Sequence, residues 1–281
     1  MIGKSRQAQI PLNSRRPPAH SAFGQGCGVL RHAQEPGTYR HTRFEPPAAV
    51  AGWVQHFWFE SWNLDNREPQ LREVLPHPCV HLAFVRGHAR IYGVQLSRFS
   101  RELKGNGCVI GVKFRPGAFY PFLRKPVATI ADTSFDAQQL FNDIPTTALA
   151  ISNCRDECGM IDRASLFLQA HLPDHDPAVE NACEAVETIA TDRSVTRVGD
   201  LIARCGVQDR TLQRLFHRYV GASPSWVIKR YRIYDALTQL DGASPGKWTE
   251  LAQNLGYYDQ AHFINDFKRL VGRSPSAYLK I

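Results

Sequence analysis

The sequence predicts an α+β protein, in which a β-rich N-terminal domain is followed by an all-α C-terminal domain with two helix-turn-helix units joined by a linker helix. Short apolar and aromatic runs dominate residues 45–145, and the apolar period becomes helical after them. A segment near the C-terminus is also repeated at an offset of 51 residues. With 281 residues, the chain has room for two domains.

The formal net charge of +8 is unevenly distributed along the chain. Residues 1–45 carry a net charge of +5, residues 46–182 of −1 and residues 183–281 of +4. A basic C-terminal domain is typical of a protein that binds a polyanion, although ordinary solvated charge would give a similar sum.

The composition also indicates a compartment. Seven cysteines at irregular spacing do not form a disulfide framework. No apolar run is long enough for a membrane span, and no secretory signal is recognisable at the N-terminus. We therefore expect a cytoplasmic protein without a membrane partner.

Composition and periodicity divide the chain into four parts. The first is rich in Pro, Gly, Arg and His and shows no apolar period, which predicts disorder. The next part has strand-like runs, the third has helical spacing, and helices separated by short turns follow. The expected parts are a disordered basic arm (1–40), a β-rich sensor or oligomerisation domain (41–145), a helical linker (146–180) and a DNA-binding domain (181–281).

Polar side chains alternate along one predicted strand, Cys79–Val85, and the residues just before it. His77, Cys79 and His81 are spaced two apart, which places them on one face. That face would bind a metal ion or an effector, or it is an ordinary packed strand. Arg115 follows a second predicted strand, Cys108–Phe114, and would either hold an anionic effector or form a structural ion pair.

The internal repeat is the most informative feature of the sequence. Phe216–Ile228 and Phe267–Leu279 are identical at seven of thirteen positions. The similarity extends upstream, where Leu201 and Gly206 pair with Leu251 and Gly256 at an offset of 50. Each extended copy contains a helix, a glycine turn at Gly206 or Gly256, and a second helix with apolar residues at helical spacing. This order is the helix-turn-helix pattern, used twice.

Capping residues set the expected helix boundaries. Ser223 and Asp259 are good N-caps, for the linker helix from Pro224 to about Leu240 and for the second recognition helix. In the first unit, Gln208 stands where the second has Asp259 and is a poor N-cap. Asp209 is therefore the alternative cap, and this leaves the direction of the next side chain open.

The chain from Leu201 onward resembles the AraC/XylS regulators, on the segments Leu201–Arg232 and Glu250–Leu279. Leu75–Phe84, Tyr92–Phe99 and Gly111–Leu123 resemble the sensor domain of one branch of that family. The resemblance implies a transcription regulator that reads two adjacent major grooves, ~34 Å apart, and that uses no cofactor. The implied partners are double-stranded DNA, RNA polymerase, a small-molecule effector and a second copy in a homodimer.

Side chains near the start of each recognition helix reach base edges in the major groove. The first unit has more charged donors there, so we expect it to supply more of the specificity. The expected base contacts are Arg210, Gln213, Arg214, Gln260, Ala261, Ile264 and Asn265, and the expected phosphate contacts are Arg218, His262 and Lys268. The effector candidates are His77, His81 and Arg115.

Three alternatives compete with this interpretation. In the first alternative, the chain is a DNA-repair or other enzyme with a regulatory DNA-binding domain, although no nucleophile motif is present. It would otherwise be a ligand-binding module that binds DNA only secondarily. Cys154, Cys158, His171 and His175 match zinc-finger spacing, but Pro173 between the histidines disturbs the required helix, so no metal is expected.

Overall fold

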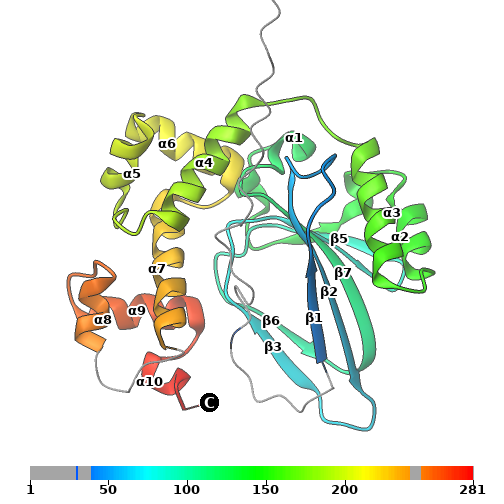
Figure 1. Ribbon diagram of the computed structural model, residues 1–281, viewed down its shortest axis with the longest axis horizontal. Coiled ribbons are helices and arrows are strands. Elements are labelled where there is room, and N and C mark those ends of the chain that lie inside the picture. Colours follow the sequence, from blue (N-terminus) through cyan, green and yellow to red (C-terminus); the bar gives the residue numbers. More distant parts are fainter. Residues whose placement is uncertain (1–29, 31–38, 241–247, 281) are drawn as a thin grey trace, which may run out of the picture.

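The computed structural model of the chain describes residues 30, 39–240 and 248–280. A β-rich N-terminal region is followed by a helical C-terminal region, as the sequence predicts (Figure 1). Of the predicted disordered arm, all but Leu30, Tyr39 and Arg40 lies outside the described residues. The described helices include none with the length and apolar character that crossing a bilayer requires.

The N-terminal region contains two antiparallel sheets. Six strands form the larger sheet in the order β1-β2-β7-β4-β5-β8, and β3 pairs with β6 in the smaller one. The strands are β1 (Tyr39–Phe44), β2 (Val54–Leu64), β3 (Gln70–Val74), β4 (His81–Val85), β5 (His88–Tyr92), β6 (Phe99–Leu103), β7 (Gly105–Phe114) and β8 (Ser134–Asp136).

Alternation along β2 gives the larger sheet two different faces. Phe57 and Phe59 are buried in the main apolar core, whereas Trp58 and Glu60 line a cavity on the other face. Gly111 of β7 lies next to Trp58, and a Cβ at this position would come within 2.1 Å of the indole ring. The absence of a side chain at residue 111 therefore allows the indole to lie against the strand.

Two helices pack against the larger sheet. α2 (Ile144–Ser152) contacts β4 and β5, and α3 (Glu157–Ala170) contacts β7 and runs beside α2 (Figure 1). Both helices therefore belong to the packing of the β-rich region. Three short helices, α1 (Tyr120–Leu123), η1 (Val127–Ile130) and η2 (Ala137–Gln139), connect the remaining strands and helices.

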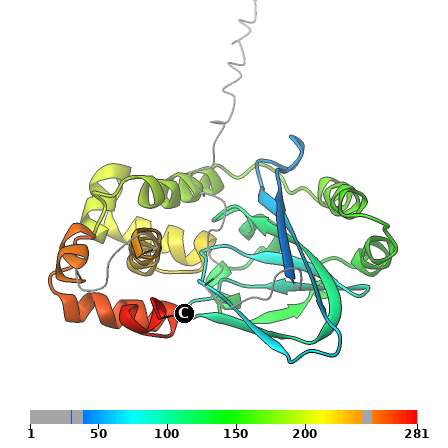
Figure 2. The same ribbon diagram turned by 60° about the horizontal axis from the view of Figure 1, so that its bottom comes forward.

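The C-terminal region is helical throughout its described part and lies beside the β-rich region in both views (Figures 1 and 2). Two helix-turn-helix units lie at opposite ends of α7 (Figure 1). Its elements are α4 (Pro177–Thr191), α5 (Val198–Cys205), α6 (Asp209–Leu215), η3 (Phe216–Val220, a π-helix), α7 (Pro224–Leu240), α8 (Trp248–Asn254), α9 (Gln260–Val271) and α10 (Pro275–Tyr278).

The two units are anchored differently. Leu212 and Phe216 of the first unit belong to the same buried cluster as Phe57 of the larger sheet. Phe263 and Phe267 of the second unit belong to a separate cluster with residues of α7. Apolar packing therefore joins the first unit to the core of the larger sheet, whereas the second unit packs in a smaller cluster that also contains Leu30 and Leu75 of the N-terminal region.

Candidate nucleic-acid interface

The first helix-turn-helix unit consists of α5, the turn at Gly206, and α6. Gly206 adopts φ 64°, in the left-handed region that suits glycine, and ends α5. Leu212 is fully buried on the inner face of α6. Arg210, Gln213 and Arg214 are exposed on the opposite face, where a DNA groove can reach them.

The start of α6 differs from one expectation. Gln208 is the N-cap, but its side chain makes no capping hydrogen bond. Asp209 is the first helical residue and not the cap, so that alternative is wrong. Its carboxylate instead accepts a hydrogen bond from the Gln213 side chain, at 3.3 Å, one turn further along the helix.

The recognition helix of the first unit ends against the N-terminal region. Its last turn is η3, and Arg218 in that turn donates a hydrogen bond to the hydroxyl of Tyr120. The Arg218 guanidinium also lies 4.5 Å from the centre of the Tyr120 ring. Arg218, expected to contact phosphate, is exposed and is held in place by an N-terminal residue.

The second unit consists of α8, the turn at Gly256, and α9. Asp259 caps α9, because its carboxylate accepts a hydrogen bond from the backbone N–H of His262 at 2.7 Å. Ala261, His262, Asn265 and Lys268 are exposed, whereas Gln260 and Ile264 are half-buried. Gln260 accepts a hydrogen bond from Thr249 at 2.9 Å, and His262 lies 3.5 Å from Asp266.

Helix α7 holds the two units at a fixed separation. Arg232, on α7, donates to the carbonyl of Thr196 beside the first unit (3.3 Å) and to the carbonyl of Leu255 in the second (2.6 Å). Its guanidinium lies 3.7 Å from the centre of the Tyr257 ring. Lys229 adds an ion pair of 3.2 Å to Asp266 on α9.

One surface hollow contains residues of both recognition helices. Gln213 and His217 reach it from the first unit and Arg269 from the second, with Lys229 between them on α7. The hollow therefore brings side chains of both units and of α7 to one surface. Leu96, Ala128 and Ala131 line its N-terminal rim.

Polar contacts join the second unit to the smaller sheet. Glu73 of β3 is 1% exposed and forms ion pairs with Arg98 and, from beyond the end of α9, with Arg273. Arg230 of α7 is 0% exposed and donates to the carbonyl of Pro76 at 2.8 Å and to the His77 ring at 2.7 Å. The segment from β3 to His77 thus contacts both α7 and the end of α9.

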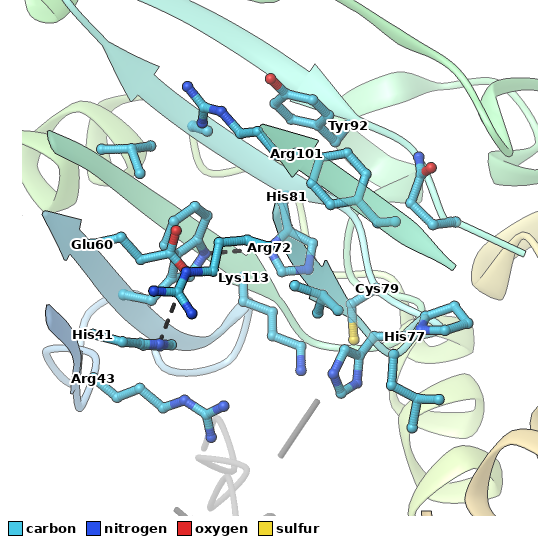
Figure 3. A pocket seen from close by; sticks show the side chains of 18 of the residues that line it. His41, Arg43, Glu60, Arg72, His77, Cys79, His81, Tyr92, Arg101 and Lys113 are labelled. Atoms are coloured by element: carbon cyan, nitrogen blue, oxygen red, sulfur yellow. Dashed lines mark hydrogen bonds and ion pairs between the residues drawn. The ribbon is translucent and has the colours of Figure 1, made fainter. Parts of the chain in front are cut away.

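The same segment lines a cavity inside the N-terminal region (Figure 3). Of the effector candidates, His77 and His81 line this cavity and Arg115 does not. Arg115 comes after the last residue of β7, and its backbone N–H donates to Trp53 at 2.8 Å. His77 and Cys79 precede β4, which begins at His81, so the predicted strand starts two residues too early.

No group of three or more metal-ligating side chains is arranged to hold an ion in the part of the chain that the structure describes. The histidines of the zinc-like pattern have other partners. His171 lies 3.0 Å from Asp143, and His175 lies 3.0 Å from Glu180.

Of the described cysteines, Cys79 and Cys183 are buried, and neither has the lowered pKa of an activated nucleophile. Burial raises the pKa of the Cys79 thiol, and it raises the pKa of the Cys183 thiol to about 11. The Cys183 thiol donates to the carbonyl of Pro116 at 2.9 Å. Both thiols therefore stay protonated near neutral pH, whereas the nucleophilic form of a cysteine is the thiolate.

Two family models match the chain. Residues 201–281 match a model described as a helix-turn-helix domain, and residues 42–136 match a domain of unknown function (DUF6597). The C-terminal region is an AraC-type helix-turn-helix domain, and this confirms the resemblance that the repeated sequence predicts.

Over 85 residues the chain is 38% identical to YidL of Escherichia coli (strain K12), an uncharacterized HTH-type transcriptional regulator. The matched stretch covers 30% of this chain and only 28% of the length of YidL. The similarity therefore concerns one domain of each protein.

Solved structures of ToxT from Vibrio cholerae are also similar to the chain. A 1.65 Å structure has 13% sequence identity and a TM-score of 0.37, over 86% of this chain and 98% of ToxT. A structure of wild-type ToxT with bound unsaturated fatty acid has 13% identity and a TM-score of 0.36, over 88% and 97%. At such TM-scores the likeness supports no further conclusion.

Several structurally central residues were not predicted. Arg230, Arg232 and Glu73 are charged residues that sequence patterns assign to solvent, yet their contacts join parts of the chain far apart in sequence. Arg230 and Arg232 lie on α7 among apolar residues, and this apolar context is the one sequence signal that could have indicated that they are buried.

Proposed function

We propose that the chain is a sequence-specific DNA-binding transcription regulator of AraC/XylS type. Helices α6 and α9 would enter adjacent major grooves on one face of the duplex, ~34 Å apart. A protein with this task works in the cytoplasm, and this location is part of the proposal.

The observation that carries the proposal is the hollow shared by both recognition helices. Gln213 and Arg269 line it from the two units, and Lys229 lies between them on α7. A duplex that placed its major grooves on α6 and α9 would pass its phosphates over this basic surface. Arg232 supports the rigid separation that such binding requires.

Each outward side chain has a role in this proposal. Arg pairs with guanine, Asn and Gln pair with adenine, and an apolar side chain contacts the thymine methyl group. The base contacts are Arg210, Gln213, Arg214, Gln260, Ala261, Ile264 and Asn265, and the phosphate contacts are Arg218, His262 and Lys268.

The N-terminal region would modulate DNA binding through a small-molecule effector. The support is the segment from β3 to His77, because His77 lines the cavity and also accepts a hydrogen bond from Arg230 of α7. A ligand that moved this segment would change the position of α7, which carries both units.

Two further partners belong to the proposal. Leu149 on α2 and Leu166 on α3 are 58% and 64% exposed, which suits a contact with a second copy in a homodimer. RNA polymerase is the partner through which bound regulator would change transcription.

Selection of bound duplexes from a random-sequence library tests the proposal. The selected DNA should contain two conserved blocks about one helical turn apart. Binding to the selected duplex should weaken steeply with salt, and Lys268→Gln should lower the slope of log affinity against log salt by about 1.

Arg163, exposed on α3 away from the interface, provides the matched control. Arg163→Gln should leave both affinity and salt slope unchanged. A salt slope near zero for the unmodified chain, or no selection of any sequence, would show that the chain is not such a regulator.

A further inference from the structure

The cavity in the N-terminal region lies between the larger sheet and the β3–β6 pair, and has a volume of about 160 Å³. One water molecule needs ~10–15 Å³ of such space, so the cavity accommodates on the order of ten non-hydrogen atoms. Aromatic and aliphatic side chains make up much of the wall, including Tyr39, Trp58, Val74, Tyr92, Phe99, Leu103 and Val109.

Positive charge predominates among the ionised groups of the wall. Arg43, Arg72, Arg101 and Lys113 line the cavity, and Glu60 is the one carboxylate among the described lining residues. Arg72 is 5% exposed and Lys113 is 4% exposed. Charges removed from water to this degree require nearby opposite charge.

The one carboxylate does not balance these cations. Burial raises the pKa of Glu60, although a hydrogen bond from Tyr39 and the charges of Arg101 and Arg72 oppose the rise. Even when fully ionised, Glu60 supplies one negative charge against four positive ones. The described lining residues therefore carry a net positive charge.

The imidazoles of the wall are neutral near pH 7 and supply N–H donors. Burial lowers the pKa of His81 to about 3, and the positive charge of Lys113 lowers it further. Burial likewise lowers the pKa of His41 to about 4, together with the charge of Arg43. The Trp58 N–H donates to Nδ1 of His81 at 3.3 Å, so the proton of His81 is on Nε2.

One buried donor in the wall has no acceptor. Nε of Arg72 is inaccessible to solvent and makes no hydrogen bond with the described residues. Nδ1 of His41 lies 4.0 Å from the Glu60 carboxylate, and the amine of Lys113 extends into the central space toward His77 (Figure 3). Unsatisfied buried donors are rare, and beside an excess of cations they indicate that an acceptor with negative charge belongs here.

We propose that this cavity binds a small organic carboxylate with an apolar body of on the order of ten non-hydrogen atoms. Arg72 and Lys113 neutralise the carboxylate, and the aromatic wall contacts the apolar body. The proposal rests on the proposed function, in which this ligand is the effector.

Probes of similar size and shape whose head groups differ in charge test the proposal. Calorimetric titration of the full chain compares phenylacetate with 2-phenylethanol and 2-phenylethylamine, and hexanoate with hexanol. Both carboxylates should bind at least tenfold more tightly than their uncharged or cationic counterparts, since charge-assisted hydrogen bonds contribute ~1.5–3 kcal/mol each.

Variants identify the site. Arg72→Gln and Lys113→Gln should each weaken carboxylate binding by about tenfold or more, whereas Arg90→Gln, at an exposed cation of β5 outside the cavity, should not. Thermal unfolding and affinity for the selected duplex establish that each variant is folded. Binding of both Gln variants with unchanged affinity would place the carboxylate elsewhere and overturn the proposal.

The outcomes also separate this proposal from the proposed function. If neither carboxylate binds, or if the alcohols bind equally well, the cavity does not select anions, while duplex binding by the same protein leaves the regulator proposal intact. Carboxylate binding without binding to any duplex would support the carboxylate site and contradict the proposal that the chain is a DNA-binding regulator.

Discussion

Replacing Arg232 by Met tests whether the two helix-turn-helix units are rigidly joined. Met preserves most of the length of the side chain and removes its donors. The variant loses the hydrogen bonds to the carbonyls of Leu255 (2.6 Å) and Thr196 (3.3 Å). It also loses the stacking of the guanidinium on Tyr257, at 3.7 Å from the ring centre.

The expected loss of stability is large for the substitution of one half-buried residue. The shorter hydrogen bond from a charged donor contributes ~1.5–3 kcal/mol, the longer one about 1 kcal/mol, and the desolvated cation–π contact about 1 kcal/mol. We expect the free energy of unfolding to fall by about 3–5 kcal/mol, measured by urea unfolding followed by far-ultraviolet circular dichroism.

DNA binding should change in a characteristic way. With α8 and α9 less firmly positioned, affinity for a duplex carrying both half-sites should fall by tenfold or more, because the second unit no longer binds at a high effective concentration. Affinity for a duplex with the first half-site alone should not change. Arg163→Met on α3 is the control and should alter neither quantity.

The reasoning is refuted if Arg232→Met changes the free energy of unfolding by less than about 1 kcal/mol and leaves two-site affinity intact. That result would mean that packing of α7 alone sets the separation of the units.

Three other predictions concern the interface, the domain contact and pH. Arg214→Ala should reduce affinity for the selected duplex by about 10–100-fold. This loss should exceed that of Asn265→Ala, because α6 presents more charged donors, and a larger loss at Asn265 would contradict this. Glu73→Ala should lower the free energy of unfolding by about 3 kcal/mol, because Arg98 and Arg273 lose a buried partner, and an unchanged urea midpoint would argue against it. The pKa of His81 is about 3 in the folded chain but near 6.5 in the unfolded chain, so between these values the unfolded chain binds more protons and stability decreases as the pH is lowered. At pH 5 the free energy of unfolding should be about 1–2 kcal/mol lower than at pH 7. Equal stability at the two pH values would exclude this effect.

The C-terminal elements were predictable because their signals are local. Asp259 and Ser223 cap the helices that follow them, and Gly206 takes the left-handed conformation that ends α5. Each effect acts within about one turn of the chain, so neighbouring residues suffice to identify it. The repeat then indicates that both units share one design.

The cavity was only partly predictable. Spacing of two placed His77 and His81 on one face, and both line the cavity even though β4 begins at His81. Arg72 and Lys113 come from β3 and β7, and their meeting depends on which strands are neighbours, which local sequence does not specify. Arg115 does not line the cavity, although Lys113, two residues before it on β7, does.

Contacts between distant parts of the chain could not be predicted at all. Arg230 meets Pro76 and His77 across more than 150 residues, and no periodicity records such a pairing. A buried arginine on a helix has the same sequence signature as an exposed one, since its burial depends on the partner that receives its hydrogen bonds.

Methylation interference at guanine N7 on the selected duplex tests the central geometry most directly, since N7 lies in the major groove. Two recognition helices that open on one side of a rigid domain predict interference in two major-groove segments about 10 base pairs apart, on one face of the duplex. Interference confined to a single major groove, or found on opposite faces of the duplex, would contradict the account.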